Sequence, residues 1–93
     1  MSIEPLVSKY ITSAEQVLSK MERTHGFITV DAEKIDAILE HVHAYLDDAK
    51  YYKAKKRFET SLTSVAYCEG LLDTLRLLGA VKFEWPANQN KQK

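Results

Sequence analysis

The chain is 93 residues long, which suits one domain with a single hydrophobic core. Its 13 Lys and Arg residues balance 13 Asp and Glu residues, so the whole molecule has no net charge to attract nucleic acid or an anionic membrane. The sequence has no run of about 18 apolar residues that would predict a membrane span, and its first residues lack a signal-peptide pattern. The only cysteine, Cys68, cannot form an internal disulfide. We therefore expect a cytoplasmic protein without a disulfide.

Apolar residues at steps of three and four predict a first helix over about residues 3–24. Pro5 suits its first turn, and Gly26 follows its expected end. The next apolar segment, residues 27–30, is too short to form a β-sheet, and we expect it to pack over the end of the helical bundle. The helical stripe consists of Leu6, Val7, Tyr10, Ile11, Ala14, Val17, Leu18 and Met21.

A second helix is predicted over about residues 31–54. Asp31 is the expected N-cap, and Glu33 in the first turn is favoured by the helix dipole. The apolar stripe of this helix consists of Ile35, Ile38, Leu39, Val42, Tyr45, Leu46, Ala49 and Tyr52.

A basic turn follows the second helix and separates it from the third. It contains neither Gly nor Pro, so a continuous kinked helix is the competing interpretation. Its cations are the one local patch that is able to meet phosphates, although charges at a helix end are more often only solvated. The candidate phosphate-binding residues are Lys50, Lys53, Lys55, Lys56 and Arg57.

The third helix is predicted over about residues 57–79, with Gly79 as its C-terminal stop. It is apolar on more than one face, which is typical of a helix that touches two neighbours or a partner subunit. We expect Val81 to Trp85 to lie back on the bundle and residues 86–93 to form a disordered tail. The predicted fold is all-α: an antiparallel three-helix bundle that forms one domain over residues 1–85.

Two linked motifs on the second and third helices resemble an archaeal family of small helical proteins called domain of unknown function 357. The resemblance covers about half the chain and implies a compact helical bundle, with no established activity. Similar family members usually have a Gly-Asp type turn where this chain has Lys55-Lys56-Arg57. The motifs read Tyr45-x-x-Asp48-Ala49 and Tyr67-x-Glu69-Gly70-x-Leu72-Asp73-x-x-Arg76-x-x-Gly79.

Three charged residues of the third helix, Glu69, Asp73 and Arg76, lie along one side at steps of four and three. They are either an acidic contact site for a partner or, as the more frequent arrangement, a polar edge bonded internally or to a neighbouring helix. Paired carboxylates can perform acid and base catalysis when burial separates their pKa values. No nucleophile or oxyanion donor accompanies them in the sequence, so we predict no catalytic residue.

Gly70 lies inside the predicted helix, where glycine costs about 1 kcal/mol relative to alanine. We therefore predict that a neighbouring helix approaches closely there, and that Tyr45, Asp48 and Tyr67 share this packing role. Under this interpretation, replacing Gly70 with Leu would destabilise the fold.

Metal and cofactor sites are not predicted. Glu40-x-x-His43 has the spacing of di-iron helical bundles, with Asp47 one turn later, but it lacks the second such motif that these sites require. His41 and His43 lie about 200° apart around the helix and cannot chelate one ion.

The breadth of the apolar surface on the third helix favours a non-enzymatic protein–protein interaction module, either a homodimer or a small accessory subunit of a larger intracellular complex. Leu71, Leu75 and Leu78 are candidate contact residues, with Phe83 and Trp85 adding aromatic surface. The alternative function is a nucleic-acid-binding accessory protein that uses the basic turn. No small-molecule substrate and no membrane partner are expected.

Overall fold

The computed structural model describes residues 3–24 and 26–86, and it is an all-α fold of three helices. The helices are α1 (Glu4–Lys20), α2 (Ala32–Ala54) and α3 (Phe58–Leu77). Within the described residues there is no strand. The predicted tail at residues 86–93 lies, except for Pro86, outside the residues that the structure describes.

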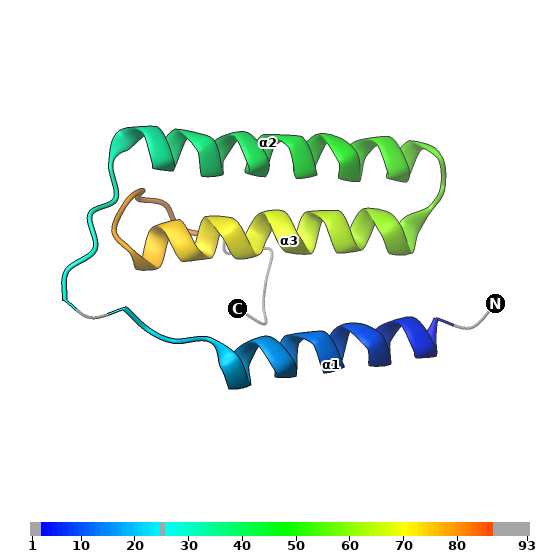
Figure 1. Ribbon diagram of the computed structural model, residues 1–93. Helices are drawn as coiled ribbons and strands as arrows, with labels where there is room; N and C mark the ends of the chain where they lie inside the picture. The colour runs from blue at the N-terminus through cyan, green and yellow to red at the C-terminus, as the bar shows by residue number, and fades with distance from the viewer. Residues whose placement is uncertain (1–2, 25, 87–93) are drawn as a thin grey trace.

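Helices α2 and α3 form a hairpin and run in opposite directions (Figure 1). The α2 helix begins as predicted, because the Asp31 side chain accepts a hydrogen bond of 3.0 Å from the backbone N–H of Lys34. The two helices are separated by a true turn, so the interpretation as a continuous kinked helix is wrong. Further along the hairpin, the Ser61 hydroxyl donates a hydrogen bond of 2.7 Å to the backbone carbonyl of Ala49.

The α2–α3 turn is a Schellman motif built on lysine. The N–H of Arg57 donates to the carbonyl of Tyr52, the N–H of Lys56 donates to that of Lys53, and Lys56 has a φ of 62°. The end of α3 repeats this pattern with Gly79 at the corresponding position, where φ is 78°. Lys56 therefore occupies a left-handed position that elsewhere in this chain is taken by glycine.

Replacing Lys56 with Gly is expected to stabilise the protein by about 1 kcal/mol, because a left-handed conformation costs an L residue roughly that amount. Urea denaturation followed by circular dichroism measures the change. Lys55→Gly is the matched control: Lys55 has a φ of −86°, so glycine relieves no strain there. A Lys56→Gly protein that is no more stable than the wild type would show that the turn carries no strain.

The core of the described chain lies between α2 and α3. Its buried side chains are Val42 and Ala49 from α2, and Cys68 and Leu75 from α3, and Leu75 is the largest of those that are fully buried. The tyrosine rings of Tyr45 and Tyr67 meet across the same interface, with their centroids 4.5 Å apart. This core is narrow, because two helices provide only one buried seam.

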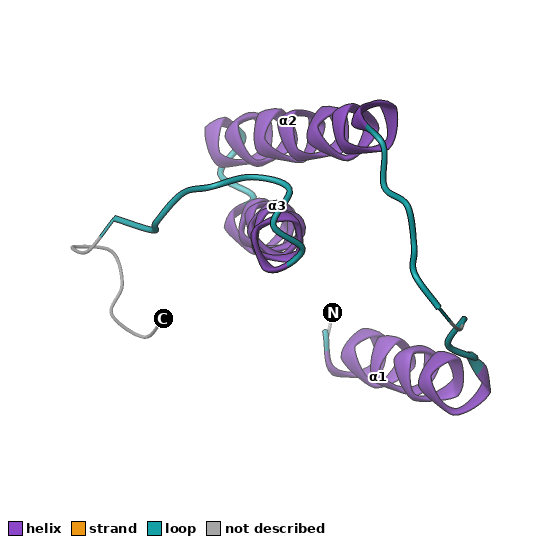
Figure 2. Ribbon diagram, turned by 90° about the vertical axis from the view of Figure 1, so that its left-hand side faces the viewer, coloured by secondary structure: helices purple, strands orange, loops and turns teal. Residues whose placement is uncertain are grey.

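The first helix lies apart from this hairpin (Figure 2). Among the described residues, α2 and α3 are the only pair of helices in close backbone contact, and α1 has no buried residue. The helix ends at Lys20, before the predicted boundary, where Met21 adopts an extended conformation. The prediction that residues 27–30 pack over the bundle end is wrong, because Phe27 is fully exposed.

Candidate functional site

The apolar stripe predicted for α1 is present and uncovered. Tyr10 is 62% exposed and Leu18 is 66% exposed. An isolated helix of this length is only marginally stable in water, so most helices of this kind are held by packing of an apolar face. The exposed members of this surface, called the α1 face below, are Ile3, Leu6, Val7, Tyr10, Ile11, Val17, Leu18 and Met21.

A shallow groove lies where the beginning of α1 approaches the beginning of α3. Its volume is about 470 Å³, and its lining is mainly apolar. The α1 side contributes Ile3, Leu6 and Tyr10, and the α3 side contributes Glu59, Thr60 and Thr63. This groove is a place where side chains of the two helices come near each other.

The outer surfaces of α2 and α3 differ in chemistry. On α2, the exposed residues Glu33, Glu40 and Asp47 recur at steps of seven, on the side opposite the buried Val42 and Ala49. On α3, the exposed positions opposite the buried Cys68 and Leu75 include Thr63, Ala66 and Gly70. We call these three residues the α3 outer face. A charged surface suits solvent, whereas an uncharged surface of small residues also suits a close helix contact.

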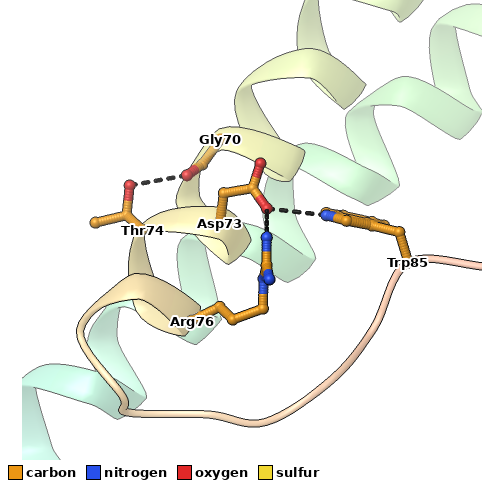
Figure 3. Close-up of polar contacts among 5 residues, drawn as sticks. All are labelled: Gly70, Asp73, Thr74, Arg76 and Trp85. Carbon is orange, nitrogen blue, oxygen red and sulfur yellow. Dashed lines mark hydrogen bonds and ion pairs between the residues drawn. The ribbon is translucent and has the colours of Figure 1, made fainter. Parts of the chain in front are cut away.

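Asp73 is the centre of the polar edge on α3 (Figure 3). Its Oδ1 accepts a hydrogen bond of 3.3 Å from Arg76 Nη2 and one of 2.9 Å from Trp85 Nε1. Arg76 also lies over the Phe83 ring, 5.4 Å from its centroid, and Phe83 meets Trp85 edge to face at 5.0 Å. Asp73 and Arg76 therefore hold the segment after α3 against that helix. This agrees with the prediction that residues 81–85 fold back on the bundle. Glu69 lies one turn earlier and is half-buried.

The packing motif is placed as follows. Tyr45 and Tyr67 are in contact across the hairpin, and Asp48 is exposed. The prediction of a close approach at Gly70 is wrong within the chain: Gly70 is exposed, and a Cβ built there would meet nothing within 4 Å. Its carbonyl accepts a hydrogen bond of 2.9 Å from the Thr74 hydroxyl. Gly70 faces away from α2, which explains why no helix of the hairpin touches it.

The assignment of Leu75 to a partner surface is also wrong. Leu75 is 0% exposed and belongs to the α2–α3 core, whereas Leu77 and Leu78 are exposed. Trp85, expected to add surface, is half-buried through its contacts with Asp73 and Phe83. The apolar residues of α3 therefore fall into two groups: those buried against α2, such as Leu75, and the exposed Leu77 and Leu78.

The cations of the basic turn are all exposed, and two of them cover tyrosine rings. Lys55 Nζ lies 5.4 Å from the centroid of Tyr51, and the guanidinium of Arg57 lies 5.2 Å from that of Tyr52. A cavity of about 510 Å³ is lined by Lys56, Arg57, Phe58, Glu59 and Thr60. These cations form one local positive patch, called the basic turn below, in a chain without net charge.

Cys68 is a buried free thiol, 3% exposed. Burial raises the pKa of the Cys68 thiol above its ordinary value, and the negative charge of Glu69 raises it further. Because the thiolate is the reactive form, this environment makes the cysteine inert.

Cys68 is expected to resist a thiol reagent at pH 7 until the hairpin opens, and to react at once in denaturant. The raised pKa also gives a pH dependence. The unfolded chain releases the thiol proton at lower pH than the native chain, so stability is full below the unfolded pKa and falls as pH rises through the native pKa. The free energy of unfolding should therefore fall relative to that of Cys68→Ala above about pH 9. Rapid labelling of the native protein would contradict this placement.

The residues weighed for metal binding do not come together. Glu40, His43 and Asp47 are exposed on α2. In residues 3–24 and 26–86, no group of three or more His, Cys, Asp or Glu side chains is arranged to hold an ion. In the same residues, none of the helices combines the length and the apolarity that crossing a membrane requires.

Comparison with known proteins identifies the family. No curated protein and no solved structure gave a significant match. The model of one family, described as Protein of unknown function (DUF357), matches residues 9–81, which include most of α1 and all of α2 and α3. This helical chain, with its α2–α3 hairpin and uncovered α1, therefore belongs to the DUF357 family.

Proposed function

We propose that the protein is a non-enzymatic protein–protein interaction module, acting as a homodimer or as a small accessory subunit of a larger complex. One observation carries the proposal: the α1 face is apolar along the whole helix and is uncovered. A contiguous exposed apolar surface of this kind marks an interaction site in soluble proteins. The proposed contact surface is the α1 face. The side of α3 that carries Leu75 is excluded, because Leu75 is buried against α2.

The low intrinsic stability of α1 also supports the proposal. In the described residues it lacks close backbone contact with the other helices, and 17 residues give little intrinsic helical stability in water. A partner that buries the α1 face would supply the missing packing free energy. We place this partner, and the protein, in the cytoplasm, where a free buried thiol such as Cys68 stays reduced.

The experiment compares the wild type with a variant that places two charges on the α1 face, Tyr10→Glu/Val17→Glu. Both positions are exposed, so the α2–α3 hairpin should keep its fold. Tagged versions of the two proteins are purified from the native source, and the mass of each purified chain is measured by light scattering. The proposal expects self-association or a co-purifying protein that the variant loses. A wild type that is monomeric without a partner, or a partner kept by the variant, contradicts it.

Binding of nucleic acid is the second candidate function, and the observation that favours it is the gathering of exposed cations at the basic turn. Two of these cations already cover tyrosine rings, which leaves the rings less available for stacking on bases. An anisotropy titration with a labelled oligonucleotide at several salt concentrations tests it. Binding that weakens steeply with salt and is lost in Lys55→Ala/Lys56→Ala supports this function, and no binding at about 50 mM salt contradicts it.

A further inference from the structure

We propose that the occupant of the α1 face is a second copy of this chain, with α1 of each copy lying on the α3 outer face of the other. This inference rests on the proposed interaction function and names its partner. The chain carries both halves of such a contact: a helix with uncovered large apolar side chains, and a second helix with an uncovered surface of small residues.

The two surfaces fit each other in shape. Positions Ile3, Val7, Tyr10, Ala14 and Val17 follow one another at alternating steps of four and three, the spacing of a helix–helix seam. On α3, Thr63, Ala66 and Gly70 follow at steps of three and four, and a Cβ at Gly70 would meet nothing within 4 Å. Small residues on one helix let large side chains of another approach closely.

The charges favour the α3 outer face over the other exposed helix surface. The outer side of α2 repeats an acidic residue every seven positions, so burying it would leave carboxylates without water. Thr63, Ala66 and Gly70 are uncharged. The acidic residues at the neighbouring steps, Glu59 and Asp73, lie at the two ends of this surface, and Asp73 is already bonded to Arg76 and Trp85. An apolar helix therefore has one suitable surface on the hairpin of a second copy.

When each copy places its α1 on the other copy, the two contacts together bury the area that a stable dimer needs. Full burial of one aliphatic side chain removes roughly 60–120 Å² from water, so the half-exposed α1 face supplies about 400 Å². A two-fold dimer contains this contact twice, so each chain contributes its α1 face and the strip of α3 that lies under α1 of the other copy. Because the two sides of a contact lose similar areas, each chain buries roughly 800 Å². That is the size of a standard specific interface, whereas one α1 contact alone falls short of it.

The connection between α1 and α2 is long enough for the exchange. The α1 helix ends at Lys20 and α2 begins at Ala32, and a fully extended chain between these two positions reaches roughly 35 Å. Exchange of identical elements through such a connection is an inexpensive route to a dimer. In the structure, α1 makes no close backbone contact with its own hairpin, and its side chains come near α3 at the groove beside its first turns (Figure 2).

The test uses two complementary variants and their mixture. Tyr10→Glu/Val17→Glu puts negative charges on the α1 face, and Thr63→Lys/Gly70→Lys puts positive charges on the α3 outer face. Buried unpaired charges should weaken self-association of each variant about 30-fold or more. In an equimolar mixture, one contact has wild-type surfaces and the other pairs Glu with Lys, so the dimer should return. Light scattering reads the mass, expected for the wild type to be twice the chain mass of 10.6 kDa.

Each outcome separates the second copy from other occupants. A monomeric wild type at about 100 µM overturns the second-copy inference. If that monomer still assembles with a different protein through the α1 face, the proposed function survives without it. A Thr63→Lys/Gly70→Lys protein that dimerises as strongly as the wild type shows that α1 pairs with α1, which also overturns it. Far-ultraviolet circular dichroism and protection of Cys68 from labelling confirm in every variant that the hairpin is folded.

Discussion

Replacing Leu75 with Ala is expected to destabilise the protein by about 2–5 kcal/mol, which is a large part of the stability of a chain this small. Leu75 is the one fully buried large side chain of the described residues, and it lies in the narrow seam between α2 and α3. Removing three carbon atoms there takes away apolar contact and leaves a cavity that two straight helices cannot easily close. Urea denaturation followed by circular dichroism measures the loss.

Leu77→Ala is the matched control for this prediction. It makes the same chemical change two residues later on the same helix, where the side chain is 82% exposed. Its cost should stay within about 0.5 kcal/mol, as for other exposed positions. Equal losses of stability in the two variants would mean that α3 presents a different side to α2.

Replacing Trp85 with Ala is expected to cost about 2–3 kcal/mol. The indole is half-buried, donates a hydrogen bond of 2.9 Å to Asp73 and packs on Phe83. Truncating a fully buried tryptophan to alanine costs about 3–5 kcal/mol, so the loss of stability for this half-buried side chain should be smaller. Without this anchor, the segment after Gly79 loses its main attachment to α3.

Trp85→Phe separates the ring from the hydrogen bond. It keeps an aromatic side chain beside Phe83 and removes the donor to Asp73, so about 1 kcal/mol of the loss should remain. Both variants are measured by denaturation with circular dichroism, since Trp85 is the only tryptophan. If Trp85→Ala unfolds at the same urea concentration as the wild type, the returning segment contributes nothing to stability.

The sequence was sufficient to predict the elements of the fold and where the hairpin begins and ends. Asp31 caps α2 and Gly79 ends α3 because their side chains, or the lack of one, satisfy purely local geometry. The turn at Lys56 was ambiguous, since a lysine in a left-handed conformation leaves no signal of its own in the sequence. The sequence therefore predicts the end of a helix well when that position holds a residue type that the cap or turn prefers, as at Asp31 and Gly79, and poorly when it does not, as at Lys56.

The inner and outer sides of α3 could not be distinguished from the sequence. Leucines at positions 71, 72, 75, 77 and 78 surround the helix, so periodicity alone does not show that Leu75 is buried and Leu77 exposed. Gly70 was assigned to a helix contact because glycine is unfavourable inside a helix, and that cost does not show which side of α3 faces α2. The bond between Trp85 and Asp73 depends on the path of the chain after Gly79, which no helical pattern encodes.

The same limit applies to α1. Its stripe predicts a surface that is buried, and it does not specify which molecule buries it. In the structure, α2 and α3 form their buried seam without α1. Our proposal places α1 on the α3 outer face of a second copy.

Hydrogen exchange of the α1 amides tests most directly whether another molecule stabilises this helix. The amides of residues 7–17 are measured at a high protein concentration and at one about 100-fold lower. We expect slow exchange at the high concentration and a return toward free-peptide rates on dilution, while the amides of the α2–α3 hairpin stay protected at both. Protection of α1 that does not change with dilution would contradict the account, because it would mean that the chain covers its own first helix.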